Sequence, residues 1–207
     1  MIQIDFVSDI ACPWCAIGLH ALEAALGNTE LAAEIRFQPF ELNPAMPPEG
    51  EDIVPHLQAK YGISPEQIAV NQQRLRERGA ELGFHFGNRS RIWNTFAAHR
   101  LLHEAGEQGP DLQRRLKHAL LRRYHGEGQN PGSVEVLREA ALEVGLRDAE
   151  RVIDSDLHLQ AVREAQAFWR QAGIQAVPAV VLNRRLLVSG GQPVEVFEQA
   201  LRQAAAG

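Results

Sequence analysis

Two cysteines separated by two residues stand near the start of the chain, where a strand pattern gives way to a helix pattern. Residues 2–7 alternate apolar and polar side chains with the period of two that is typical of a strand. Residues 16–26 have a helical composition that stops at Gly27-Asn28. Cys12-Pro13-Trp14-Cys15 therefore lies at a strand-to-helix turn, and the strand pattern at residues 34–40 completes a β-α-β unit.

A long helical block follows this unit. Residues 43–50 are rich in proline and glycine and predict a linker. Helical segments then follow one another from about Ser64 to Gln171. Starts of these helices are predicted at Ser64-Pro65-Glu66, Asn130-Pro131 and Asp148.

The end of the chain returns to strand and helix patterns. Two short strands with a turn between them predict a hairpin over residues 177–188, and Pro193 starts a final helix. The order of elements predicts an α/β domain that an all-helical domain interrupts. We place the first part of the α/β domain at residues 1–43, the linker and helical insertion at 44–155, and the second part at 156–207.

Composition excludes several classes of function. The 207 residues suffice for one ordinary domain or for one domain with a large insertion, and 45% hydrophobic with 23% charged residues is typical of soluble globular proteins. The net charge of −5 and the pI of about 5.9 give the molecule no electrostatic attraction to phosphate backbones or anionic membranes. We therefore expect neither nucleic acid nor a membrane as partner.

The amino-terminal residues predict the compartment. Met1 to Phe6 include no basic leader and no long apolar segment, and no apolar run in the chain approaches the roughly 18 residues of a membrane helix. We therefore expect a cytoplasmic protein. In a reducing compartment two neighbouring cysteines indicate catalysis or metal binding more often than a structural bridge.

The spacing of the two cysteines suits redox chemistry. Two intervening residues at a helix start let one thiol attack a disulfide that the other has formed. Cys12 faces the positive end of the helix dipole and unpaired backbone N–H groups, so we predict a pKa below the free value of about 8.5. Cys15 lies one turn further in, where it is shielded and acts as the resolving thiol.

Three other interpretations of the pair fit the sequence less well. A structural zinc site takes four Cys or His ligands, and the sequence has no second CxxC and only His20 nearby. A static disulfide does not suit the expected compartment, and two inert buried thiols would not explain the strand-turn-helix setting. The sequence therefore predicts a redox pair and no metal.

Several segments resemble one known family. Ser8 to Cys15, followed by Ile17-Gly18, resembles the active-site segment of FrnE-like members of the DsbA family of thiol-disulfide oxidoreductases. Residues 94–101 resemble the helical-domain motif of that family, and residues 173–178 and 188–193 resemble its carboxyl-terminal half. The resemblance implies a thioredoxin fold with an inserted helical domain and dithiol-disulfide exchange. Ala16 stands where these relatives often carry an aromatic residue, which bears on substrate preference.

The resemblance also implies a substrate-contact surface. It implies a cis-proline opposite the CxxC, here Pro178, although by frequency alone an X-Pro bond is cis in only about 5–6% of cases. In such folds the backbone of the preceding residue, here Val177, pairs with the substrate. Pro13 and Trp14 lie between the thiols and must face the substrate, so we expect Trp14 to be exposed.

Other polar residues have ordinary structural interpretations. We interpret Asn94 and His99 as a cap, a surface group or a satisfied core histidine rather than as groove residues. Asp9 either tunes Cys12 or caps the turn, and spacing does not decide between these roles. The basic run at residues 114–123, which contains Lys117, fits the wet face of an amphipathic helix rather than an anion site.

Three functions remain to be compared. The leading hypothesis is a disulfide oxidoreductase or isomerase that has no bound cofactor and exchanges disulfides with protein or small-molecule thiols. The second is a glutathione-dependent isomerase or transferase similar to 2-hydroxychromene-2-carboxylate isomerase and kappa-class glutathione transferases. Those relatives typically have serine where Cys12 stands. Glutathione would be a redox partner in the first hypothesis and a co-substrate in the second. The third is a non-catalytic binding or chaperone module.

Overall fold

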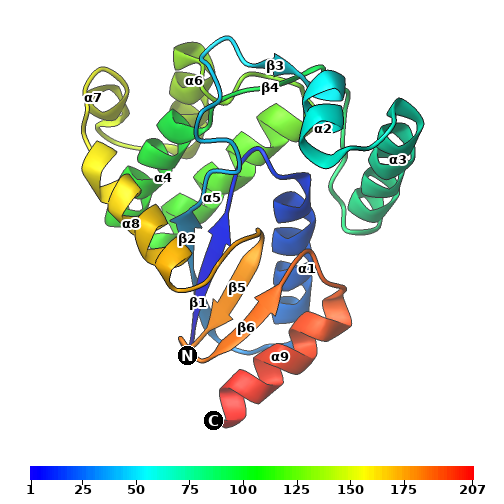
Figure 1. Cartoon of the computed structure of the whole chain (residues 1–207). Coiled ribbons are helices and arrows are strands. Elements are labelled where there is room, and N and C mark those ends of the chain that lie inside the picture. Colours follow the sequence, from blue (N-terminus) through cyan, green and yellow to red (C-terminus); the bar gives the residue numbers. More distant parts are fainter.

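A four-stranded sheet forms the base of the molecule in the computed structural model, which describes all 207 residues (Figure 1). Its strands are β1 (Ile2–Ser8), β2 (Ala33–Pro39), β5 (Ala179–Leu182) and β6 (Leu186–Ser189), in the order β2-β1-β5-β6. Strand β1 runs parallel to β2 and antiparallel to β5, and β5 pairs antiparallel with β6. The two ends of the sequence therefore meet in one sheet.

Two helices complete this part of the molecule. Helix α1 (Pro13–Thr29) connects β1 to β2, and α9 (Val194–Ala206) packs against α1 and against β1, β5 and β6. The β-α-β and β-β-α units are thus both present, as the sequence predicts. This is the thioredoxin fold, and the remaining helices are inserted between β2 and β5 (Figure 1).

The insertion is almost entirely helical. Its elements are β3 (Glu51–Asp52), α2 (Ile53–Tyr61), α3 (Pro65–Glu81), β4 (Arg91–Ile92), α4 (Phe96–Gln108), α5 (Pro110–Leu121), the π-helical turn η1 (Arg122–Gly126), α6 (Val134–Val144) and α7 (Ala149–Ile153). Helix α8 (Leu159–Gln171) follows and leads to β5, within the segment 156–207 that the sequence analysis assigns to the second part of the α/β domain. Helices α4, α5 and α8 pack against the edge strand β2, whereas α3 contacts α1. None of the helices combines the length and the apolar composition needed to cross a membrane.

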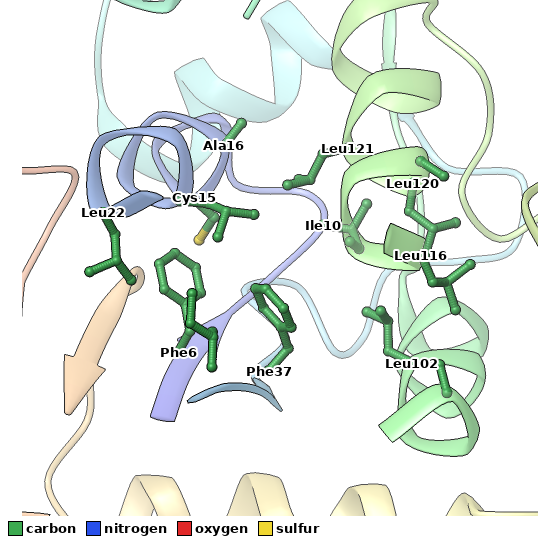
Figure 2. Close-up of a cluster of buried hydrophobic side chains, with 14 of the residues drawn as sticks. Phe6, Ile10, Cys15, Ala16, Leu22, Phe37, Leu102, Leu116, Leu120 and Leu121 are labelled. Carbon is green, nitrogen blue, oxygen red and sulfur yellow. The ribbon is translucent and has the colours of Figure 1, made fainter. Parts of the chain in front are cut away.

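One hydrophobic core runs through both the sheet and the insertion. Its main cluster of 37 buried residues includes Phe6 of β1, Leu22 of α1 and Leu120 of α5. Figure 2 shows Cys15 in this cluster, with its sulfur directed toward the ring of Phe6. The helical insertion is therefore packed onto the thioredoxin part at the cysteine motif rather than tethered beside it.

Two helix boundaries differ from the sequence prediction. Helix α1 begins at Pro13, whose fixed φ suits the first helical position, and continues through Gly27-Asn28 until Glu30 adopts a left-handed conformation. Helix α6 begins at Val134 rather than at Asn130-Pro131. There the Asn130 side chain accepts a hydrogen bond from the Gly132 N–H at 2.8 Å, which makes a turn instead of a helix start.

The insertion begins earlier than its predicted first helix. The start at Ser64 is confirmed by a capping box, in which the Ser64 hydroxyl accepts from the Gln67 N–H and the Gln67 side chain accepts from the Ser64 N–H. Helix α2 and strand β3 precede this helix, and strand β4 follows it. Neither α2 nor the two-stranded β3–β4 ribbon is predicted from the sequence. Strands of two residues are too short to show an alternating pattern.

Two glycines of α1 give a matched test of how closely this helix packs. A Cβ on Gly18 would lie 2.9 Å from Cγ of Pro178, whereas a Cβ on exposed Gly27 would meet nothing within 4 Å. Gly27→Ala should stabilise the protein by about 0.5–1 kcal/mol through helix propensity. Gly18→Ala should instead lower the free energy of unfolding by about 1 kcal/mol or more because of overpacking. Urea denaturation of both variants checks this, and equal effects would contradict the close approach.

Candidate active site

The fold places the two thiols in different surroundings. Strand β1 ends at Ser8, and a turn brings Cys12 to the position just before α1, while Cys15 lies in the first turn of that helix. Both thiols are free. Cys15 is completely buried, whereas Cys12 is 5% exposed.

The Cys12 thiol is the more acidic of the two. Its pKa is lowered chiefly by a hydrogen bond from the Cys15 thiol, and further by the backbone N–H groups of Cys15 and Trp14, against the opposing effects of burial and of the Asp9 charge. The predicted direction is confirmed, although the neighbouring thiol outweighs the helix end. When protonated, the Cys12 thiol donates to the Val177 carbonyl at 3.5 Å.

The Cys15 thiol has the opposite character. Burial raises the pKa of Cys15 well above its ordinary value, and the neighbouring Cys12 raises it further, while the charge of Lys117 lowers it. Cys15 therefore stays protonated in the resting dithiol. This matches the shielded second thiol that the sequence predicts.

Cys12 is less exposed than the sequence prediction assumed. A thiol that reacts first would be expected at the surface, but the Cys12 side chain is turned toward the Val177 carbonyl and the residue is only 5% exposed. Cys12 lines an open groove in the protein surface. A substrate must therefore enter this groove to reach the Cys12 sulfur.

The other predicted contact residues gather around the same point. The Val177–Pro178 peptide bond is cis, as the resemblance implies, and Pro178 is buried against Gly18 of α1. Trp14 is 43% exposed, as predicted, and Pro13 is half-buried. The sheet thus brings residues from the two ends of the sequence to the two cysteines.

A groove of about 390 Å³ opens between the cysteine motif and helices α2 and α3. Apolar side chains line most of it, among them Trp14 and Leu57. Its charged lining residues are Lys60 and Arg89, and no Asp or Glu side chain lines it. Lys60 donates to the Leu42 carbonyl and to the Asn43 side chain at 3.0 and 2.5 Å. Sequence reasoning considered a groove between the two domains but missed its lining on α2 and α3, which depends on how the insertion folds back over α1.

Asp9 holds the turn before Cys12 in place. Its buried carboxylate accepts hydrogen bonds from the Ala11 N–H at 3.1 Å, the Leu42 N–H at 2.7 Å, and the side chains of Thr95 at 2.7 Å and His99 at 3.3 Å. Burial would raise the pKa of Asp9, but the hydrogen bond and attraction of His99, with the other donors, lower it. The carboxylate thus joins three separate segments of the chain.

Asn94 and His99 have the structural roles that the sequence analysis favoured. The Asn94 side chain accepts from the Phe96 N–H at 2.8 Å at the start of α4 and donates to the Met46 carbonyl at 3.1 Å. His99 is a buried histidine whose partner is Asp9. Neither residue is among those that line the groove beside Cys12.

The interpretation of the basic run as a wet helix face is wrong for one residue. Arg114 and Arg115 are exposed, but Lys117 is fully buried. Lys117 falls on the same face of α5 as Gln113 and Leu120, one helical turn away in each direction, and both are buried. This spacing could have identified Lys117 as a buried cation.

Replacing Asp9 tests its two effects at once. Asp9→Asn presents an amide to four donors, so we expect the free energy of unfolding at neutral pH to fall by about 2–4 kcal/mol. Since the pKa of folded Asp9 is lowered, its stabilisation is complete above the pKa of an unfolded aspartate, about 3.9, and is lost as pH falls through the lower folded pKa. Because the Asp9 charge raises the pKa of Cys12, the same variant should have a Cys12 pKa below that of the wild type.

Denaturant unfolding measures the first effect, and the rate of Cys12 alkylation against pH measures the second. Asp111→Asn, at an exposed residue in the first turn of α5, is the matched control and should change neither quantity appreciably. An unchanged stability or a raised Cys12 pKa in Asp9→Asn would contradict the proposed network.

The sheet, the cis-proline and the paired thiols define the class of protein. Cys12 lies at the amino end of the first helix, and its buried partner Cys15 lies in the first turn of that helix. Together with the Val177–Pro178 loop opposite them, they form a thioredoxin-fold dithiol centre. The chain belongs to the family of DSBA-like thioredoxin domains, whose profile matches residues 3–202. The resemblance noted from the sequence is therefore confirmed.

Individual proteins agree with this assignment. A probable DsbA oxidoreductase of Streptomyces coelicolor is 32% identical, with a TM-score of 0.88 over 100% of this chain and 91% of that chain. The uncharacterized protein YwbO of Bacillus subtilis is 29% identical over 97% of this chain and 96% of its own length.

Two more distant structures share the fold. 2-Hydroxychromene-2-carboxylate isomerase is 12% identical with a TM-score of 0.70, covering 98% of this chain and 96% of that chain. The cytosolic disulfide reductase DsbM of Pseudomonas aeruginosa, solved with glutathione, is 17% identical with a TM-score of 0.67, covering 99% of this chain and 100% of that chain.

Proposed function

We propose that this protein exchanges disulfides with protein or small-molecule thiols through Cys12 and Cys15. The observation that carries the proposal is the opposite tuning of the two thiols. The pKa of Cys12 is lowered beside an open groove, whereas the pKa of Cys15 is raised in the core. A thiolate is the nucleophile in disulfide exchange, so this difference assigns the order in which the two sulfurs react.

The exchange proceeds in two balanced steps. The Cys12 thiolate attacks a substrate disulfide, forms a mixed disulfide with one substrate sulfur, and releases the other as a thiolate that takes a proton from solvent. Cys15 then loses its proton and attacks the Cys12 sulfur. The Cys12–Cys15 disulfide forms, the second substrate sulfur leaves as a thiolate, and the substrate is reduced as the protein is oxidised. The reverse sequence oxidises a dithiol substrate.

The Val177 backbone supports docking of an extended substrate. Its carbonyl lies 3.5 Å from the Cys12 sulfur, at the end of the loop that leads into β5. A peptide paired with this segment would bring its disulfide to Cys12 through main-chain hydrogen bonds, with little demand on side-chain sequence. Trp14 supplies an exposed aromatic surface beside it.

Glutathione is a second candidate substrate. The groove beside Cys12 has an apolar lining with Lys60 and Arg89 and no acidic side chain, which suits a small thiol that carries carboxylates. The related fold of DsbM was solved with glutathione. Retention of Cys12 favours redox exchange over the isomerase chemistry of relatives that typically have serine there.

The cytoplasm is the compartment that we propose. Both cysteines of the chain belong to the motif, so the fold contains no structural disulfide that an oxidising compartment would have to maintain. DsbM is itself described as a cytosolic disulfide reductase.

Single substitutions of the two cysteines test the proposal. Cys12→Ser should abolish reduction of a disulfide substrate such as insulin, because Cys15 is buried and protonated at neutral pH. Cys15→Ser should still react once and then remain as a mixed disulfide. Turnover assays and intact-protein mass spectrometry measure the two outcomes. Wild-type turnover by Cys12→Ser would reject the assignment, and equal suppression of aggregation by both variants without reduction would favour a chaperone module.

A further inference from the structure

Lys117 is a buried cation without a partner. Its side chain in α5 is completely inaccessible, and its ammonium nitrogen has no hydrogen-bond acceptor. The nitrogen lies over the ring of Phe37, 5.8 Å from its centroid. Burying an amine without a partner destabilises a fold, because the amine loses its hydration without compensation. Packing therefore does not explain why a lysine stands at this position.

The groups that face Lys117 belong to the active site. Its charge acts on the thiols of Cys15 and Cys12 and on the Asp9 carboxylate, which lie on α1 and just after β1. It also acts on His125 in η1, and His99 of α4 lines the same cavity. Burial lowers the pKa of Lys117 to about 8, although the neighbouring thiols and Asp9 oppose this effect.

The other buried groups are poor acceptors for a proton from Cys15. The Asp9 carboxylate already accepts four hydrogen bonds, and its pKa is lowered. His125 is hydrogen-bonded through Nε2 to the Ile10 carbonyl at 2.8 Å, and burial holds its pKa well below the ordinary value. Lys117, in contrast, is a buried base whose charge acts on the Cys15 thiol and which makes no hydrogen bond.

A polar cavity connects Lys117 with the surface. It has a volume of about 130 Å³, well above the roughly 10–15 Å³ needed to hold one water molecule. Buried Lys117 and His99 line its inner end, and exposed Arg36 and Glu107 line its outer end. This cavity is separate from the groove beside Cys12, so a proton can leave here while a substrate fills the groove.

We propose that Lys117 accepts the proton of Cys15, relayed through water, when Cys15 resolves the mixed disulfide. The inference rests on the proposed exchange reaction. The neutral amine takes the proton from the Cys15 thiol, and the resulting Cys15 thiolate forms a bond to the Cys12 sulfur. The bond between Cys12 and the substrate sulfur breaks, and the substrate leaves as a thiolate with the electron pair. The proton on Lys117 then passes through the cavity to solvent.

The charge of Cys12 favours this proton transfer in the mixed disulfide and opposes it in the resting dithiol. In the resting dithiol the Cys12 thiolate raises the pKa of both Cys15 and Lys117, so each keeps its proton. Once Cys12 is part of a mixed disulfide, its negative charge is gone. The Lys117 ammonium then becomes more acidic and its neutral form more abundant, while the Cys15 thiol becomes easier to ionise.

A symmetric aromatic disulfide such as dithiobis(nitrobenzoate) separates the two steps in one experiment. Attack by Cys12 releases the first coloured thiolate, and resolution by Cys15 releases the second. In the wild type the second phase should accelerate with rising pH and reach its plateau below about 8, because the pKa of Lys117 is about 8 in the resting dithiol and falls once the Cys12 charge is gone. In Lys117→Met the first phase should be unchanged and the second should slow by about tenfold or more, with its rise moved to higher pH.

Two further variants separate base catalysis from charge and from general damage. Lys117→Arg keeps the charge but does not release a proton, since the guanidinium pKa exceeds about 12, so its second phase should also be slow. Arg115→Met removes an exposed cation from the same helix and should leave both phases unchanged. A wild-type second phase in Lys117→Met, or full activity in Lys117→Arg, would overturn the proposal. A missing first phase in the wild type would instead overturn the proposed function.

A measurement on the native lysine guards against misfolding of the variants. The chain has two lysines, Lys60 and Lys117, so isotope-labelled lysine gives two resonances to titrate by NMR. In the Cys15→Ser protein, capping Cys12 with a methylthio group should lower the pKa of Lys117, because the negative charge of the Cys12 thiolate is removed. An unchanged Lys117 pKa on capping would contradict the proposal.

Discussion

The buried carboxylate of Asp9 is the interaction on which the site depends. It accepts hydrogen bonds from the cysteine turn, from the segment after β2 and from the start of α4, and these segments are distant in sequence. Because a buried charge is tolerated only when its hydrogen bonds are made, each donor must be in place for the others to be useful. The carboxylate therefore fixes the insertion to the thioredoxin part at the position where Cys12 needs a defined geometry.

The two parts of the molecule make different contributions to the chemistry. The thioredoxin part supplies both thiols and the Val177–Pro178 loop, which together form a dithiol centre. The insertion supplies the groove walls on α2 and α3, and it buries Lys117 of α5 where its charge acts on both thiols. The common hydrophobic core holds both sets of residues in one rigid arrangement. In the proposed exchange reaction, substrate choice and proton movement would thus depend on the insertion, while the sulfur chemistry would depend on the thioredoxin part.

The sequence predicted the parts of the structure that have local causes. The strand before Cys12, the helix after it and the capping box at Ser64 follow from periodicity and turn chemistry over a few residues. The placement of Val177 and Pro178 came from the family resemblance. The burial of Lys117, the groove and the partners of Asp9 depend on packing between distant segments, which a single sequence does not specify. The basic run around Lys117 indicates a wet helix face because apolar residues are interleaved with it, but Lys117 itself lies at helical spacing from the buried residues Gln113 and Leu120.

The reversible state of the cysteine pair is the most direct test of this account. The protein would be equilibrated in mixtures of reduced and oxidised glutathione, started separately from the reduced and the oxidised protein, and the free thiols counted by alkylation and mass spectrometry. We expect both starting points to reach the same curve, with a single transition in which Cys12 and Cys15 gain or lose their disulfide together. A pair that stays reduced throughout, or one that forms only mixed disulfides without a Cys12–Cys15 bond, would contradict a dithiol-disulfide centre.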